Sequence, residues 1–161
     1  MIQPDGHHLA ELNVARLIAD PDALEVAEFV ANLDRINDLG KRMPGFQWIM
    51  EGSGTPGTGN MENCIGNDPR YVANLTVWEN VNFLRKFVFD TVHAQFLTRR
   101  HEWFQVLKEM HFVMWWVPAG HRPSLAEALE RLDHLRGSGN SDFAFGWDFV
   151  ESPTAEIIAQ E

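Results

Sequence analysis

The order in which strand-like and helix-like segments follow one another most restricts the fold of this chain. Four segments with alternating, β-branched or aromatic residues predict strands, and two longer segments with apolar residues three or four positions apart predict helices. The expected strands cover residues 8–17, 46–51, 71–78 and 111–118, and the expected helices cover 22–43 and 81 to about 107. This β-α-β-β-α-β order is typical of the ferredoxin-like fold, an α+β architecture with two helices on one face of a four-stranded antiparallel sheet.

Capping patterns mark the expected starts of two helices. Asp22, followed three residues later by Glu25, is placed to cap the first helix. Ser124 and Glu127 form the same pattern before a third helix, which we expect to end before Gly137. Both helices should therefore begin with a side-chain hydrogen bond to a free backbone N–H.

The chain is expected to form one domain, because 161 residues are typical of a single unit with its own core. We divide it into a ferredoxin-like core at about 8–118 and a C-terminal helix and tail at 119–161. Residues 143–150 are expected to form a last strand or an extended arm.

The fourth expected strand indicates that both faces of the sheet are covered. The stretch HFVMWWV is apolar on both faces, since His111 is its single polar residue. Two helices on one face would leave the other face exposed. The sequence therefore predicts a homodimer in which two sheets pack against each other as a dimeric α/β barrel.

Composition and charge exclude several kinds of partner. The chain has 23 acidic and 13 Lys or Arg residues and a formal charge of −10, whereas nucleic acids and anionic membranes bind basic patches. No apolar run approaches the ~20 residues of a membrane span, and the N-terminus lacks the pattern of a signal peptide. Cys64 is the single cysteine and offers no internal disulfide. We expect a cytoplasmic protein that binds a small molecule.

Four stretches resemble a bacterial family of unknown function, DUF3291, almost from end to end. They are HLAELNVARL, EFVANLDRIN, LTVWENVNFLRKFVFDTVHAQFLTRRHEWF and WWVPAGHRPSLAEALERLDHLR, and the resemblance covers roughly residues 8–150. The family is placed in the dimeric α/β-barrel, antibiotic biosynthesis monooxygenase-like superfamily. The loop Ser53–Asp68 departs from the family pattern, so its role does not follow from the resemblance.

The superfamily implies oxidoreductase chemistry of two kinds. Some of its oxygenases oxidise aromatic polyketides without a cofactor, and others bind and degrade haem with an Asn on the first strand, a Trp and a helical His that ligates iron. Asn13 and His93 are similar in position to that Asn and His. The Trp has no counterpart, because Trp78 ends a strand and the corresponding helical position is Phe83. The resemblance thus implies either no cofactor or haem on His93.

His93 is the first candidate for catalysis. On a helical wheel, five residues lie on its side of the helix, namely Phe89, Phe96, Leu97, Arg100 and Phe104. The preceding part of the helix presents its apolar residues elsewhere, which predicts a bend or a shift of register near Asp90-Thr91. Burial would lower the pKa of His93 and keep it neutral, able to accept a proton or bind a metal. A core histidine bonded to a carbonyl is the structural alternative.

Glu11 and Asn13 are two residues apart on the first strand and so share one face of the sheet. If that face meets the helices, the amide of Asn13 could hold an oxyanion or a peroxide oxygen. A buried Glu11 could act as an acid or a base. The alternative for Glu11 is an ion pair with Arg16 or another basic residue at the sheet edge.

Other side chains are candidates for contact with a ligand. Asn74 and Trp78 share a face of the third strand, and Arg100 could hold a carboxylate or phenolate, although an exposed helix arginine is common. Aromatic residues could line the same pocket, and the candidates are Trp48, Trp78, Phe89, Phe96 and Trp116. The sequence contains no HExxH motif, paired CxxC motif or phosphate-binding GK[ST] loop.

These residues leave three functions open. The first is a monooxygenase-like enzyme acting on an aromatic or enolisable metabolite in a pocket between sheet and helix. The second is an acid–base isomerase, cyclase or dehydratase using the same pocket through Glu11 and His93. The third is a non-catalytic binding protein in which His93 is structural.

Overall fold

The computed structural model describes residues 2–52 and 65–150. Its sheet has four antiparallel strands in the order β2-β3-β1-β4, as the ferredoxin-like order requires. The strands are β1 His7–Arg16, β2 Phe46–Ile49, β3 Tyr71–Trp78 and β4 Phe112–Pro118. The helices are α1 Ala27–Lys41, α2 Val81–Asp90, α3 Val92–Thr98, α4 Leu125–Ser138 and α5 Trp147–Val150, with 3-10 turns at η1 Leu24–Val26 and η2 Arg100–Glu102. The expected α+β fold with a four-stranded antiparallel sheet is confirmed.

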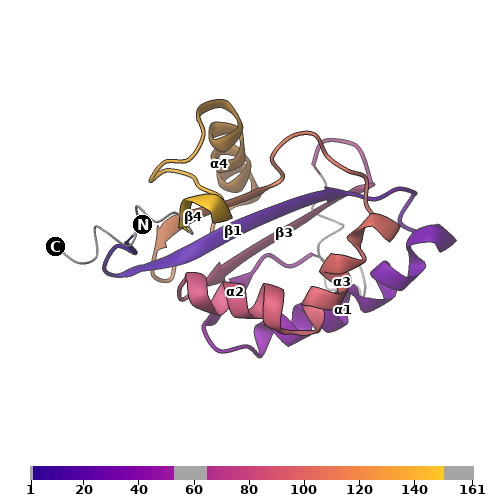
Figure 1. The fold of residues 1–161 in the computed structure, drawn as a ribbon, viewed down its shortest axis with the longest axis horizontal. Coiled ribbons are helices and arrows are strands. Elements are labelled where there is room, and N and C mark those ends of the chain that lie inside the picture. Colours follow the sequence, from indigo (N-terminus) through magenta and orange to yellow (C-terminus); the bar gives the residue numbers. More distant parts are fainter. Residues whose placement is uncertain (1, 53–64, 151–161) are drawn as a thin grey trace.

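Two layers of helix enclose the sheet. Figure 1 shows α1, α2 and α3 on one side of the strands and α4 on the other. Because side chains alternate along a strand, Ala10, Leu12 and Val14 of β1 all face α4. They pack in one cluster with Leu132 of α4, which is fully buried. Leu9 of the same strand packs on the opposite side, among residues of α2. The core therefore lies on both faces of one sheet.

Helix α4 covers the sheet face from which we expected a second subunit. Trp115 of β4 is 0% exposed in the single chain, and its Nε1–H donates to Glu127 Oε1 of α4 at 3.1 Å. Arg131 of α4 lies over the Phe143 ring, 3.7 Å from its centroid, and so joins α4 to the segment that follows it. The apolar face of the sheet therefore needs no partner subunit for its burial. The homodimer remains a prediction, but the burial of this face no longer supports it.

The segment after α4 closes the outer edge of β4. Phe145 and Met114 exchange two backbone hydrogen bonds, of 2.9 and 2.7 Å, and form a single β-bridge. The chain then turns into α5, where the ring of Trp147 stacks on Phe112 at 5.5 Å. The expected last strand or extended arm is therefore one bridge followed by a helical turn. Residues 53–64 of the central loop and residues 151–161 of the tail lie outside the described residues.

One of the two expected caps is confirmed and the other is wrong. Ser124 Oγ accepts a hydrogen bond from the backbone N–H of Glu127 at 3.1 Å. The helix runs through Gly137, and Gly139 follows it with a φ of 77°. Asp22 caps no helix, because η1 intervenes and α1 begins at Ala27 without a side-chain cap.

The expected bend near Asp90-Thr91 is a complete break between α2 and α3. Thr91 is extended, with φ −118° and ψ −176°. Its Oγ donates to the Phe87 carbonyl at 2.6 Å and accepts from the His93 N–H at 3.2 Å. One hydroxyl therefore ends α2 and begins α3, which lets the two helices present different faces to the sheet. The helix expected to about 107 ends at Thr98, followed by η2.

Replacing Thr91 by alanine is expected to lower the free energy of unfolding by about 1 kcal/mol, because both hydrogen bonds of the hydroxyl are lost. Thr91→Ser should keep them. Thr98→Ala is a matched control, since Thr98 is exposed and its hydroxyl bonds only the Gln95 carbonyl. Urea unfolding measures all three variants. Equal stability of the Thr91→Ala and Thr98→Ala variants would show that the break does not depend on this hydroxyl.

No helix in the described parts of the chain is both long enough and apolar enough to cross a membrane.

Candidate functional site

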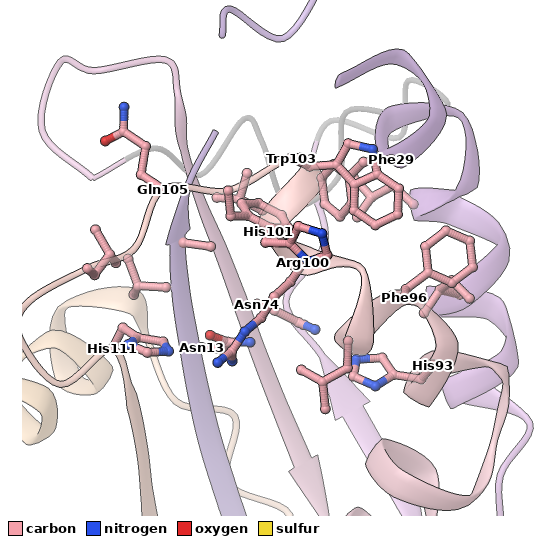
Figure 2. A pocket seen from close by; sticks show the side chains of 18 of the residues that line it. Asn13, Phe29, Asn74, His93, Phe96, Arg100, His101, Trp103, Gln105 and His111 are labelled. Carbon is pink, nitrogen blue, oxygen red and sulfur yellow. The ribbon is translucent and has the colours of Figure 1, made fainter. Parts of the chain in front are cut away.

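A cavity of about 350 Å³ lies between the sheet, α1, α3 and the segment that leads from η2 to β4. Figure 2 shows it from close by. The lining residues come from β1 and β3 (Asn13, Val14, Ala15, Val72, Asn74), from α1 (Phe29, Asn32, Leu33, Ile36, Asn37), from α3 (His93, Phe96, Leu97) and from the following segment (Arg100, His101, Trp103, Phe104, Gln105, Val106, Leu107, His111). Its volume falls within the ~300–1,000 Å³ of small-molecule sites.

Two asparagines form the polar floor of the cavity. Asn13 of β1 and Asn74 of β3 are directly opposite each other in the antiparallel register, so their side chains project from the same face. The buried Oδ1 of Asn74 has no hydrogen-bond partner among the described residues. A buried polar atom without a partner is costly, so a ligand or water that donates a hydrogen bond here would be stabilised.

His93 enters the cavity from the first turn of α3. Its Nδ1 lies 3.2 Å from the Val88 carbonyl oxygen, which can only accept, so Nδ1 carries the proton in the neutral ring. Nε2 is then an unprotonated acceptor. Burial lowers the pKa of His93 below its ordinary value of 6.5, against the smaller opposing effect of the bond to Val88. The imidazole is therefore neutral at pH 7, as the sequence predicted.

Aromatic rings make the apolar wall. The rings of Phe96 and Trp103 stack with centroids 5.7 Å apart, and Phe29 of α1 meets Phe104 edge to face at 4.8 Å. Trp103 is 3% exposed, and its position is fixed by a hydrogen bond from the Ile18 N–H to its carbonyl. The wall is thus built from three separate segments, namely α1, α3 and the residues after η2.

Arg100 and its neighbour Arg99 differ in whether their side chains are paired with carboxylates. Arg99 donates to both carboxylate oxygens of Glu28, at 2.8 and 2.7 Å, and to Glu102 at 2.6 Å. Arg100 lines the cavity from an exposed position, and its side chain makes no hydrogen bond or ion pair with any other described residue. Within the described parts of the chain, no lining residue is Asp or Glu, although the formal charge is −10.

Glu11 does not line the cavity. It is 5% exposed and lies in a buried chain of hydrogen bonds, in which Trp78 Nε1–H donates to Thr76 Oγ at 2.9 Å and Thr76 donates to Glu11 Oε1 at 2.5 Å. Desolvation raises the pKa of Glu11 to about 8, despite the opposing bond from Thr76. The carboxyl is therefore mainly protonated at pH 7. The alternative pairing with Arg16 is not formed either, because Arg16 binds Asp68 at 2.8 Å.

Four of the expected aromatic contacts lie elsewhere. Trp78 is 1% exposed and stacks on Phe87, and Trp48 packs against the cluster under α4. Phe89 is 47% exposed and meets Trp147, because the break at Thr91 rotates α2 away from α3. Trp116 packs beside Phe145. Asn13, Asn74, His93, Phe96 and Arg100 are the candidates that the fold brings together at the cavity.

Several lining residues were not predicted as site residues. Trp103 and Phe104 were placed in a continuing helix, whereas they follow η2 and pair with the end of β1 through the bridge of Leu17 and Phe104. Asn32 and Asn37 left a signal in the sequence, as amides adjoining the apolar stripe of α1 at Leu33 and Ile36. An amide beside a core stripe is a reasonable marker of a polar cavity.

Among the described residues, no group of three or more His, Cys, Asp or Glu side chains could hold a metal ion. The lining also does not fit haem on His93. The cavity of about 350 Å³ is at the lower end of the range for small ligands, and Arg100 is the one lining side chain of the described residues with a permanent positive charge for the two propionates.

The sheet order and the cavity define an α+β protein with a small-molecule pocket between its sheet and its helices. The chain belongs to the DUF3291 family, described as a domain of unknown function, whose model matches residues 8–159. None of the curated proteins matches it.

Two solved structures from Nitrosomonas europaea are similar to this chain at 10% identity. One is a protein of unknown function, with a TM-score of 0.49 over 75% of this chain and 99% of that chain. The other is described as a "putative antibiotic biosynthesis monooxygenase", with a TM-score of 0.45 over 77% of this chain and 100% of that chain. Similarity at this level says nothing about the reaction.

Proposed function

We propose that the protein is a monooxygenase-like enzyme that takes an aromatic or enolisable metabolite into the cavity and removes a proton from it with His93. The observation that carries this proposal is a neutral imidazole at the wall of a cavity whose floor is the Asn13–Asn74 pair. A base, two amides and an aromatic wall are the groups needed to make and hold a carbanion or enolate.

His93 supplies the proton acceptor. Because Val88 holds the Nδ1–H, the basic lone pair is on Nε2, and the tautomer needs no rearrangement before proton transfer. The side-chain N–H groups of Asn13 and Asn74 can donate to the oxygen of the developing enolate. Glu11 makes no contact with the substrate in this scheme, since it is enclosed in the sheet.

Oxygen would then react with the bound carbanion. In balanced form, a methylene group and O₂ give a carbonyl group and water: the carbanion is oxidised, O₂ is reduced to a hydroperoxide, and the hydroperoxide loses water. The protein's own groups would exclude solvent and hold the anion, while the substrate itself supplies the electrons.

The same base without oxygen would give an isomerase, cyclase or dehydratase. The neutral His93 favours this second candidate as much as the first, because proton removal is common to both. The version that used Glu11 as a second acid–base group loses support, because Glu11 does not line the cavity.

Hydrogen exchange into 2-tetralone, an aromatic ketone with an enolisable benzylic methylene, tests the proposal. In D₂O the protein is expected to accelerate deuterium uptake, measured by NMR, and His93→Gln should reduce that acceleration by about 10²–10⁴-fold. The rate should be constant above pH 7 and fall as His93 is protonated, at a pH below the ordinary 6.5 because burial lowers its pKa.

Lys108→Gln is the matched control, since Lys108 is exposed and does not line the cavity. Oxygen uptake during exchange would favour the monooxygenase, and exchange without oxygen uptake would favour the acid–base enzyme. Binding of 2-tetralone with no exchange would contradict catalysis and leave the non-catalytic binding protein.

A further inference from the structure

Within this acidic protein, the lining of the cavity has the opposite charge balance. The chain carries 23 acidic residues, yet none of the described Asp and Glu side chains lines the cavity. The charged side chain in the lining is Arg100, and the other titratable groups there are the imidazoles of His93, His101 and His111. Since a charge of −10 repels anions at long range, an anion would bind only where carboxylates are locally excluded.

Arg100 is an unpaired cation as far as the described residues are concerned. Two carboxylates of the neighbouring segments, Glu102 of η2 and Glu28 of α1, are both occupied by Arg99. Arg99 also lies over the Trp103 ring, 4.8 Å from its centroid, and is not among the residues that line the cavity. Arg99 thus neutralises the local carboxylates and leaves Arg100 with no partner among the described residues.

The neutral polar groups adjoin this cation. In the view of Figure 2, the side chain of Arg100 extends from its helical turn towards the strands that carry Asn13 and Asn74. The amides offer further N–H donors, and the Oδ1 of Asn74 has no partner within the described parts of the chain. Beyond them, Phe96 and Trp103 form a stacked apolar surface at 5.7 Å.

We propose that the cavity selects an aromatic carboxylate, with the carboxylate on Arg100 and the Asn13–Asn74 floor and the ring against Phe96 and Trp103. This inference rests on the proposed function, because it names the substrate class of the same cavity. A planar guanidinium without a competing partner is suited to bind a carboxylate through two parallel hydrogen bonds. The aromatic wall supplies the apolar contact that a small inorganic anion would lack.

Three naphthalene probes of nearly equal shape test the charge preference: 2-naphthoate, neutral 2-naphthamide and the cation of 2-(aminomethyl)naphthalene. By titration calorimetry, 2-naphthoate should bind at least about tenfold more tightly than 2-naphthamide, and the cation most weakly. Arg100→Gln should remove the preference for 2-naphthoate while 2-naphthamide binding persists, which shows that the variant is folded. Arg100→Lys should keep part of the preference, and Lys108→Gln should keep all of it.

Equal binding of the anion and the amide would overturn the inference, as would a preference that survives in Arg100→Gln or no binding of 2-naphthoate at millimolar concentration. This result is separable from the proposed function. Deuterium exchange into neutral 2-tetralone without anion preference would contradict only the substrate class. Anion preference without exchange would contradict only the catalytic role of His93.

Discussion

Glu11→Gln is expected to make the protein more stable than the unchanged chain at alkaline pH, by roughly 3–5 kcal/mol above pH 8. Burial raises the pKa of Glu11 from 4.5 in the unfolded chain to about 8 in the folded protein. A carboxyl with a raised pKa binds its proton more tightly in the folded protein than in the unfolded chain. Its contribution to the free energy of unfolding is therefore fully present below about pH 4.5 and is lost as the pH rises to about 8. Glutamine has no proton to lose.

The free energy of unfolding can be measured with urea at pH values between about 5 and 9, and the effect is a difference between the two proteins in the slope of that free energy against pH. The unchanged protein should lose stability across the window from 4.5 to about 8, and the Glu11→Gln curve should be flatter. Glutamine keeps an oxygen that accepts from Thr76, so little change is expected at low pH. Glu25→Gln, at an exposed position, is the control. Parallel curves for Glu11→Gln and the unchanged protein would contradict a protonated Glu11.

A neutral Glu11 also bears on the cavity. It lies two residues from Asn13 on the same face of β1, and a charge there would repel an anionic ligand or an enolate. The buried chain of Glu11, Thr76 and Trp78 therefore supports the site in an uncharged form, although it does not touch the cavity.

Leu132→Ala in α4 is expected to lower the free energy of unfolding by about 3 kcal/mol, within the ~2–5 kcal/mol of fully buried leucines. Leu132 is 1% exposed and packs on the sheet face that α4 covers. The loss has two causes, the missing contacts of the removed carbons and the void left between helix and sheet.

Leu129→Ala is the matched control, because Leu129 is in the same helix and only partly buried. Its loss should be clearly smaller when both variants are measured by urea unfolding. Equal, small losses would contradict the conclusion that α4 buries this face of the sheet. The Thr91 variants test the other layer of helices independently.

The site could be predicted in part. Alternation along a strand is a local property, so the sequence alone puts Asn13 and Asn74 on one face of their strands. The helical wheel likewise groups Phe96 and Arg100 with His93. It fails at Phe89, because the wheel assumes one continuous helix and the chain breaks at Thr91. Glu11 was expected in the pocket because alternation puts it on the same face of the strand as Asn13. Alternation fixes the face of the sheet on which a side chain lies, but it does not fix whether that side chain reaches the cavity.

The sequence by itself determined the order of the elements, the faces of the strands and the position of the helix break, since each follows from backbone periodicity over a few residues. Only the tertiary structure decided that α4 covers the second face of the sheet and that Glu11 is sealed away from the cavity while Asn13 lines it. It also decided that Arg99 is paired while Arg100 has no partner among the described residues. The reason is physical: burial, the pKa of a carboxyl and the pairing of a charge depend on which distant segments pack together.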